Sequence, residues 1–236
     1  MSTAITDPFN IPTVQLYSSI EDPFAYLAAY RLRQIWPDYL DRLKIFWRAL
    51  PLEYINHACT PQPQFEADRL LFAQIEPALH FISWQKEQWC WPNTLWPAFE
   101  ALACAQAQGS VAAMEYSWAL RYAHFAEGRC ISLRHELMAI AEEVAGQGYL
   151  YYPRFQIEWD TGKYKRTIIA ESWMGWRDLK LPKGATFILP NGNRITNPAI
   201  GEIDFDVQTG STPNYIPFTG DPLNVYRAIL DQALQN

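Results

Sequence analysis

Side chains able to carry out acid–base chemistry are concentrated at residues 18 to 22, in the run Ser-Ser-Ile-Glu-Asp that precedes a proline. Asp22 could act as a general acid or base beside a bound ligand, because burial can tune a carboxyl group for proton transfer. Ser18 and Ser19 could offer hydroxyl groups to the same ligand. Alternatively, Asp22 only caps a helix, since the same Asp-Pro pair recurs at residue 221, where the last helix is expected to begin. The residues alone leave both interpretations open.

The cysteines and histidines show no redox or metal-binding motif. No two cysteines are separated by only two residues, so we expect free thiols rather than the Cys-x-x-Cys chemistry of a dithiol. Cys59 follows a predicted strand and is a candidate for disulfide exchange, although no neighbouring cation would stabilise its thiolate. The histidine spacing predicts no metal ion. The complete set is Cys59, Cys90, Cys104, Cys130, His57, His80, His124 and His135.

The charge distribution argues against nucleic-acid and membrane partners. The net charge is −6 and the chain has no run of Lys or Arg, so we do not expect the positive surface that binds phosphates. No stretch approaches the roughly 18 uncharged apolar residues of a membrane-spanning helix. The first residues lack the basic and apolar regions of a signal peptide. We therefore expect a globular, cytoplasmic protein.

A strand and a helix are expected to position the acidic turn. Residues 13 to 18 alternate in polarity and carry β-forming side chains. Asp22 and Pro23 suit the start of a helix that Pro37 should end, and residues 43 to 48 are typical of a second strand. Strand, helix and strand in this order predict a right-handed βαβ unit with parallel strands.

The rest of the chain divides into a helical block and a second group of strands and helices. Alanine-rich windows punctuated by glycine predict the block of helices, at residues 94–108, 110–127 and 132–145. The second group comprises an amphipathic helix at 160–179, a strand at 185–189, an Asn-Gly hairpin turn at 191–192, a strand at 194–196 and a helix at 221–233. Because two strands alone form a marginal sheet, the first pair should be completed by the last pair. We therefore predict one domain of residues 13–60 and 150–236, with a helical insertion of residues 61–149.

This order of elements resembles the DsbA-type thioredoxin fold, which 2-hydroxychromene-2-carboxylate isomerases and kappa-class glutathione transferases share. The segment VQLYSSIEDPFAYLA from residue 14 is similar to the family's opening strand, active-site turn and first helix. Residues 91–109 and 122–132 are similar to its alanine-rich helix and the turn that follows the next helix. The resemblance implies an α/β chain in which a thioredoxin fold carries an all-helical insertion domain.

The resemblance places Asp22 where redox members have their first catalytic cysteine, and where the isomerases and transferases have a serine. A carboxylate at this position disfavours an activated thiolate, because the positive end of the helix already faces a negative charge. The family's cis-proline is replaced by Ala185, for which a trans bond is expected, since a cis bond without proline costs about 2.5–4 kcal/mol. The resemblance implies Asp22 and Ser19 as catalytic residues. The substrate-binding residues that it implies are Ser18, Pro23, Phe24, Gly184, Ala185, Thr186 and Arg194.

The resemblance implies an oxidoreductase, or a relative of the isomerases and glutathione transferases, that binds a small thiol or organic acid near Asp22 without dithiol chemistry. Glutathione is the implied ligand, no metal is expected, and a homodimer is possible as in relatives. The alternative is a catalytically inactive thioredoxin scaffold used for partner binding or dimerisation. A cluster of tryptophans could line an aromatic pocket or only pack in the core; it comprises Trp84, Trp89, Trp91 and Trp96.

Overall fold

A four-stranded mixed sheet lies at the centre of the computed structural model, which describes residues 11–204 and 214–235. Its strand order is β2-β1-β3-β4, with β1 parallel to β2 and antiparallel to β3. The strands are β1 (Thr13–Ser18), β2 (Lys44–Ala49), β3 (Thr186–Ile188) and β4 (Arg194–Thr196). The hairpin of β3 and β4 thus completes the sheet begun by the first two strands, as the sequence predicts.

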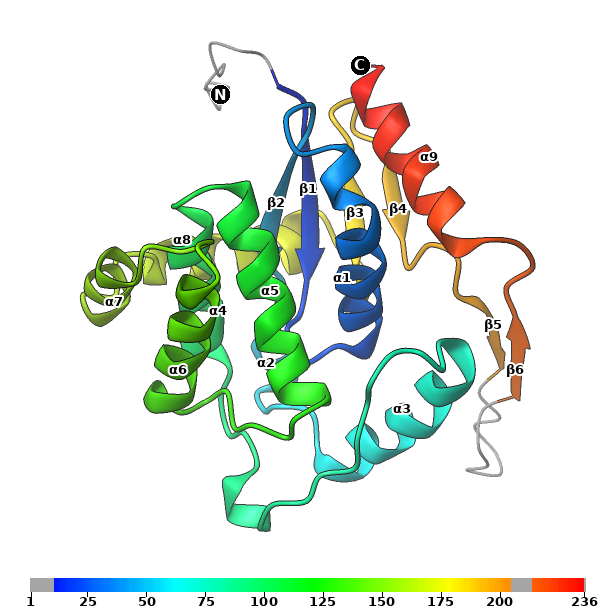
Figure 1. Cartoon of the computed structure of the whole chain (residues 1–236). Helices are drawn as coiled ribbons and strands as arrows, with labels where there is room; N and C mark the ends of the chain where they lie inside the picture. The colour runs from blue at the N-terminus through cyan, green and yellow to red at the C-terminus, as the bar shows by residue number, and fades with distance from the viewer. Residues whose placement is uncertain (1–10, 205–213, 236) are drawn as a thin grey trace.

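Helices cover both faces of this sheet (Figure 1). On one face lie α1 (Pro23–Ile35), α5 (Ser110–Phe125) and α9 (Pro222–Leu234), and on the other lies α8 (Lys165–Trp173), which continues as a π-helical segment, Met174–Asp178. The remaining elements are α2 (Leu52–Asn56), α3 (Gln62–Ile75), α4 (Trp96–Gln106), α6 (Arg134–Gly146), α7 (Tyr152–Asp160), short 3-10 turns at Trp36–Asp38 and Gln88–Cys90, and a separate antiparallel pair, β5 (Gly201–Asp204) and β6 (Asn214–Pro217).

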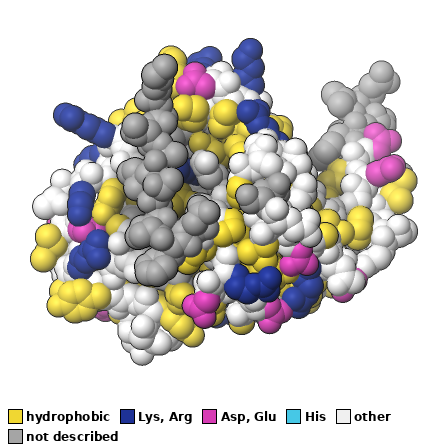
Figure 2. All heavy atoms as spheres, turned by 90° about the horizontal axis from the view of Figure 1, so that it is seen from above, with side chains coloured by type: hydrophobic (Ala, Val, Ile, Leu, Met, Phe, Trp, Pro, Cys, Tyr) yellow, Lys and Arg dark blue, Asp and Glu magenta, His cyan; other side chains and the backbone are white. Residues whose placement is uncertain are grey.

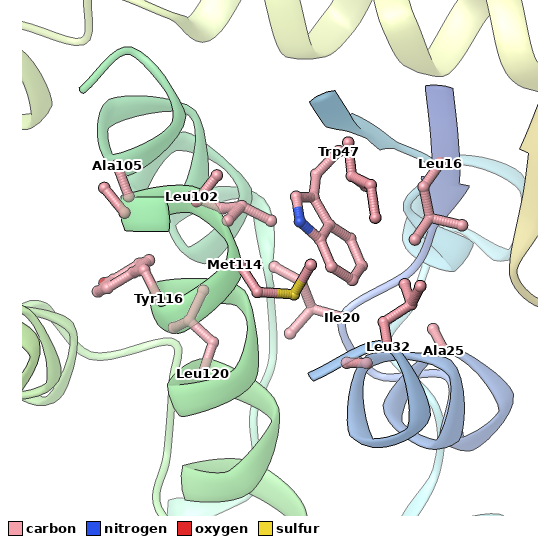
Figure 3. Close-up of a cluster of buried hydrophobic side chains, with 14 of the residues drawn as sticks. Leu16, Ile20, Ala25, Leu32, Trp47, Leu102, Ala105, Met114, Tyr116 and Leu120 are labelled. Atoms are coloured by element: carbon pink, nitrogen blue, oxygen red, sulfur yellow. The ribbon is translucent and has the colours of Figure 1, made fainter. Parts of the chain in front are cut away.

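Successive side chains of β1 point to opposite faces of the sheet, and the two faces have different surroundings. Val14 and Leu16 are fully buried against α1, α5 and α9, whereas Gln15 and Tyr17 point to the α8 side. Figure 3 shows the centre of the first face, where the Trp47 ring of β2 lies between Leu102 and Met114 of the helical block and Leu16 of the sheet. The helical block and the sheet therefore share one core.

Side chains of the helices block the open edge of β2. The Trp47 backbone N–H donates to Gln106 Oε1 at 2.7 Å, and the Ala49 N–H donates to Glu171 Oε2 at 2.9 Å. An unpaired strand edge is a template for association with another chain. These two side chains satisfy two backbone N–H groups of that edge from within the chain.

Basic and acidic side chains are interspersed with apolar ones on the described part of the face in Figure 2. Some pairs connect distant elements, such as Arg33 with Glu115 at 2.9 Å and Arg227 with Asp38 at 2.5 Å. Exposed pairs of this kind contribute only about 0–1 kcal/mol each, so the core dominates stability. Within residues 11–204 and 214–235, no helix is both long and apolar enough to cross a membrane.

Most predicted elements are confirmed within one or two residues, including the helix after Asp22, the parallel strands and the Asn-Gly hairpin. The single amphipathic helix predicted for residues 160–179 is wrong. The chain turns after α7 with Gly162 at φ +62°, and α8 begins only at Lys165. The last turn widens to a π-helix at Gly175, where a Cβ atom would lie 2.5 Å from Leu50 Cδ1. The chain approaches the sheet too closely there for a side chain.

Candidate functional site

The turn between β1 and α1 is closed by Asp22, which caps the helix. Its Oδ1 accepts a hydrogen bond from the Phe24 backbone N–H at 2.9 Å, and its own backbone is extended at φ −89° and ψ 121°. Asp221 caps α9 in the same way, through Leu223 N–H at 2.9 Å. The capping prediction is therefore confirmed at both Asp-Pro pairs. The two aspartates differ in burial, since Asp22 is 0% exposed and Asp221 lies on the surface.

Burial gives Asp22 an unusual proton affinity. Removal of the carboxylate from water raises its pKa from 3.8 to about 6, although the nearby Lys183 ammonium and the Phe24 N–H oppose the rise. Its second oxygen, Oδ2, is buried and has no hydrogen-bond partner among residues 11–204 and 214–235. A carboxyl group that titrates near neutral pH and keeps one oxygen unused is suited to proton transfer.

Arg121 of α5 is the functional candidate that sequence reasoning missed. It is fully buried, and its guanidinium donates to Ser18 Oγ at 2.9 Å and to Ser117 Oγ at 2.6 Å. It also stacks 4.8 Å from the centre of the Trp47 ring. Burial lowers the pKa of Arg121 to about 9, and the Asp22 carboxylate opposes this change. An arginine within the alanine-rich helix predicted at residues 110–127 was the signal available in the sequence.

Three further buried polar atoms in this region lack a hydrogen-bond partner in the described part of the chain: Arg121 Nε, Ser19 Oγ and Glu21 Oε1. Such atoms are rare in folded proteins because an unsatisfied buried group costs about 1–3 kcal/mol. With Asp22 Oδ2, the turn presents both donors and acceptors that the described residues do not satisfy. This is the arrangement expected around a small polar ligand.

Cys59 lies beside the same turn in an environment hostile to a thiolate. Burial and the carboxylates of Glu21 and Glu53 raise the pKa of the Cys59 thiol well above its ordinary value. Glu21 itself accepts a hydrogen bond from the Thr60 N–H at 2.7 Å, and burial raises its pKa. These negative neighbours argue against disulfide exchange through Cys59.

The loop before β3 reaches the turn from the other side. The bond before Ala185 is trans, as predicted. The backbone N–H of Ala185 donates to Asn197 Oδ1 at 2.8 Å, and its carbonyl accepts from Asn197 N at 2.9 Å. Gly184 has φ +120° and lies against the Asn197 side chain, so a Cβ atom would not fit there. Thr186 is buried and shares a hydrogen bond with Thr196 at 2.8 Å.

The structure brings most of the predicted site residues to one end of the sheet. Ser18, Ser19 and Asp22 are buried together, followed by Pro23 and Phe24 at the start of α1. Thr186 pairs with Tyr17 in the register of β1 and β3, which places the Gly184 loop beside this turn. Arg194 is not brought there. It pairs with Ile188, farther along the sheet, and donates to the Leu179 carbonyl at 2.9 Å.

The four tryptophans do not line one pocket, so the prediction of an aromatic pocket is wrong. Trp84 and Trp91 pack edge to face at 4.9 Å beside His124, whose pKa burial lowers to about 4. Trp89 is 83% exposed, and Trp96 packs near Tyr54 instead. Two of the four thus belong to the core around α3 and α5. Within the described ranges, no group of three or more His, Cys, Asp or Glu side chains is placed to hold a metal ion.

The topology defines a class of protein. A β-α-β unit, a helical block and an antiparallel strand pair with a final helix form a thioredoxin-type sheet interrupted by helices. No protein-family model matches the chain, and neither does any curated protein.

Solved structures match nearly the whole chain at low sequence identity. Cytosolic disulfide reductase DsbM from Pseudomonas aeruginosa is 19% identical with a TM-score of 0.63, covering 94% of this chain and 98% of its own. The same protein solved with GSH is 18% identical with a TM-score of 0.60, covering 95% and 100%. A putative protein disulfide isomerase from Nitrosomonas europaea is 12% identical with a TM-score of 0.60, covering 95% and 98%. The chain therefore has the DsbA-like thioredoxin fold with a helical insertion that its sequence predicts.

Proposed function

We propose that this chain binds glutathione, or another small thiol or organic acid, at the turn between β1 and α1. It would then be a relative of the oxidoreductases, isomerases and glutathione transferases with this fold. The observation that carries the proposal is the set of unsatisfied buried atoms: Asp22 Oδ2 accepts, Arg121 Nε donates and Ser19 Oγ does either. That DsbM, which has the same fold, was solved with GSH supports a small thiol as the ligand.

The chemistry we propose is proton transfer at Asp22 rather than dithiol exchange. An ordinary thiol has a pKa of about 8.5 and Asp22 titrates at about 6, so moving the thiol proton to Oδ2 is uphill by about 3 kcal/mol. A hydrogen bond from the charged Arg121 guanidinium to the thiolate contributes about 1.5–3 kcal/mol, which offsets most of this cost. The ligand sulfur would therefore lie between Asp22 and Arg121, with the Ser19 hydroxyl beside it.

Ligand entry requires a movement of the segment that leads into α3. Asp22 is 0% exposed and Glu21 is 4% exposed, so the turn is closed in this conformation. The hydrogen bond from Thr60 to Glu21 and the edge-to-face contact of Phe24 with Phe72 at 4.9 Å hold the segment in place. We propose that a bound ligand displaces this segment and takes over the hydrogen bonds of the turn.

A cytoplasmic location fits a ligand of the glutathione type and free cysteines. A homodimer is part of the same proposal, as an expectation from relatives. Light scattering after size-exclusion chromatography measures the mass directly, and a strictly monomeric chain would remove the dimer from the proposal while leaving the ligand site.

Calorimetric titration with reduced glutathione and with S-methylglutathione tests the ligand site. The unmodified chain should bind the free thiol more tightly, because only the thiol can donate its proton to Asp22. Asp22→Asn should weaken binding by about tenfold or more, the loss expected for one charge-assisted hydrogen bond. Asp221→Asn is the matched control, since it alters the same Asp-Pro cap at an exposed position.

The Asp221→Asn chain should retain the affinity of the unmodified chain within about twofold, because asparagine caps a helix as well as aspartate. An absence of heat with millimolar glutathione would overturn the proposal. Equal affinities of the Asp22→Asn and Asp221→Asn chains would overturn the role of Asp22. Equal binding of the free and methylated thiols would overturn the proton transfer.

A further inference from the structure

A cavity lies on the face of the sheet opposite α1, away from the Asp22 turn. It has a volume of about 790 Å³, within the range of about 300–1,000 Å³ typical of small-molecule sites. Its floor is formed by Gln15 and Tyr17 of β1 and Ile188 of β3. Its wall is formed by Ala170 of α8 and Met174 of the π-helical segment. Because Val14 and Leu16 face α1 while Gln15 and Tyr17 face α8, the sheet itself separates this cavity from α1.

Three arginines surround this cavity, and one carboxylate accompanies them. Arg48 is paired with Glu171 at 2.6 Å, and the second oxygen of that carboxylate accepts the Ala49 N–H. Arg166 and Arg194 also line the cavity. Within residues 11–204 and 214–235, neither has a carboxylate partner. The cavity therefore carries an excess of two positive charges.

Arg166 and Arg194 differ in how they are held. Arg194 is positioned by its hydrogen bond to the Leu179 carbonyl at 2.9 Å, and the other nitrogens of its guanidinium are available to a ligand. Arg166 stands on the exposed side of α8 at the rim. A guanidinium group matches the planar, two-oxygen geometry of a carboxylate. The head group that fits these residues is a carboxylate.

An apolar surface continues from the cavity along α8. Ala170 and Met174 line both this cavity and a second hollow formed with Ile169 and Trp173. Ile169 is 55% and Trp173 is 54% exposed, although large apolar side chains are usually covered. A ligand with an apolar body would lie on these side chains while its anionic head meets the arginines.

We propose that this cavity is a binding site for an organic carboxylate with an aromatic or aliphatic body. Arg194 and Arg166 bind the carboxylate, and Ala170, Met174 and Trp173 pack against the apolar part. The site is independent of the proposed function at Asp22, so each can be true without the other. Asp22→Asn should accordingly leave the affinity for a carboxylate bound here unchanged.

Titration calorimetry with naphthalene-2-carboxylate tests the site, and naphthalene-2-carboxamide is the uncharged control of the same shape. The carboxylate should bind and the amide should bind at least about tenfold more weakly, as expected for the loss of a charge-assisted hydrogen bond. Arg194→Gln and Arg166→Gln should each weaken carboxylate binding by about tenfold. Ala170→Trp should weaken it, because the indole ring would occupy part of the apolar wall on which the ligand body packs.

Arg177→Gln is the matched control, because Arg177 is an exposed arginine of the adjoining π-helical segment that lines a different hollow, with Glu53 and His57. This variant should keep the affinity of the unmodified chain. Arg166 is exposed and makes no ion pair within residues 11–204 and 214–235, so its replacement should leave the free energy of unfolding nearly unchanged, and urea unfolding of the variant checks this. Equal binding of acid and amide, an equal loss in Arg177→Gln, or an unchanged affinity in Ala170→Trp would overturn the proposal.

Discussion

Replacing Asp22 with asparagine removes a buried titrating group and keeps the helix cap, since the two residues cap helices about equally well. The pKa of Asp22 is about 6 in the folded chain against an ordinary 3.8, so the folded state holds this proton more tightly than the unfolded chain. The stability that this group contributes is therefore complete below pH 3.8 and is lost as the pH rises through about 6. The difference amounts to about 3 kcal/mol at pH 8 and about 1.5 kcal/mol at pH 5.

Asp22→Asn should therefore raise the free energy of unfolding by up to about 3 kcal/mol at pH 8 and by about half as much at pH 5. Urea unfolding followed by circular dichroism at both pH values measures this. The control, Asp221→Asn, should change the free energy by less than about 0.5 kcal/mol at either pH. A destabilised Asp22→Asn chain at pH 8, or an effect that does not depend on pH, would refute burial as the source of the raised pKa.

Two further predictions concern packing and thiol reactivity. Gly175→Ala should lower the free energy of unfolding by about 1–3 kcal/mol, because the new methyl group meets Leu50 at 2.5 Å. Gly146 of α6 has open space around it, so Gly146→Ala should raise the free energy of unfolding by about 0.5–1 kcal/mol. Urea unfolding of both variants measures these changes. Equal effects of the two substitutions would contradict the packing argument. The raised pKa of Cys59 predicts that iodoacetamide alkylates it at least about tenfold more slowly than free glutathione at pH 8. Rapid modification, followed by mass spectrometry, would show that the thiol is not shielded.

The fold was predictable because its signals are local. The polarity alternation of residues 13 to 18, the Asp22-Pro23 start and the Asn-Gly hairpin each specify a backbone conformation with few alternatives. The prediction of a single helix over residues 160–179 failed because tertiary packing overrides helix propensity there. Gly162 ends one turn, and the approach of Gly175 to the sheet widens the next helix into a π-helix.

The candidate site was predictable only in part. Sequence reasoning placed the turn of Asp22 correctly, since a helix cap depends on neighbouring residues. It could not place Arg121, which is 103 residues from Ser18 in the chain and meets it only when α5 packs against the sheet. Nor could it separate Arg194 from the turn, because that separation depends on the pairing of β3 with β4.

By itself the sequence determined the strands and helices of the central sheet, the start of a helix at Asp22-Pro23 and the absence of a Cys-x-x-Cys motif, because these depend on residue identity and short-range geometry. Only the tertiary structure decided that Asp22 is buried, that its carboxyl group therefore titrates near pH 6, and that a buried guanidinium lies near it. The physical reason is that proton affinity depends on dielectric environment and on charges brought together across long stretches of chain.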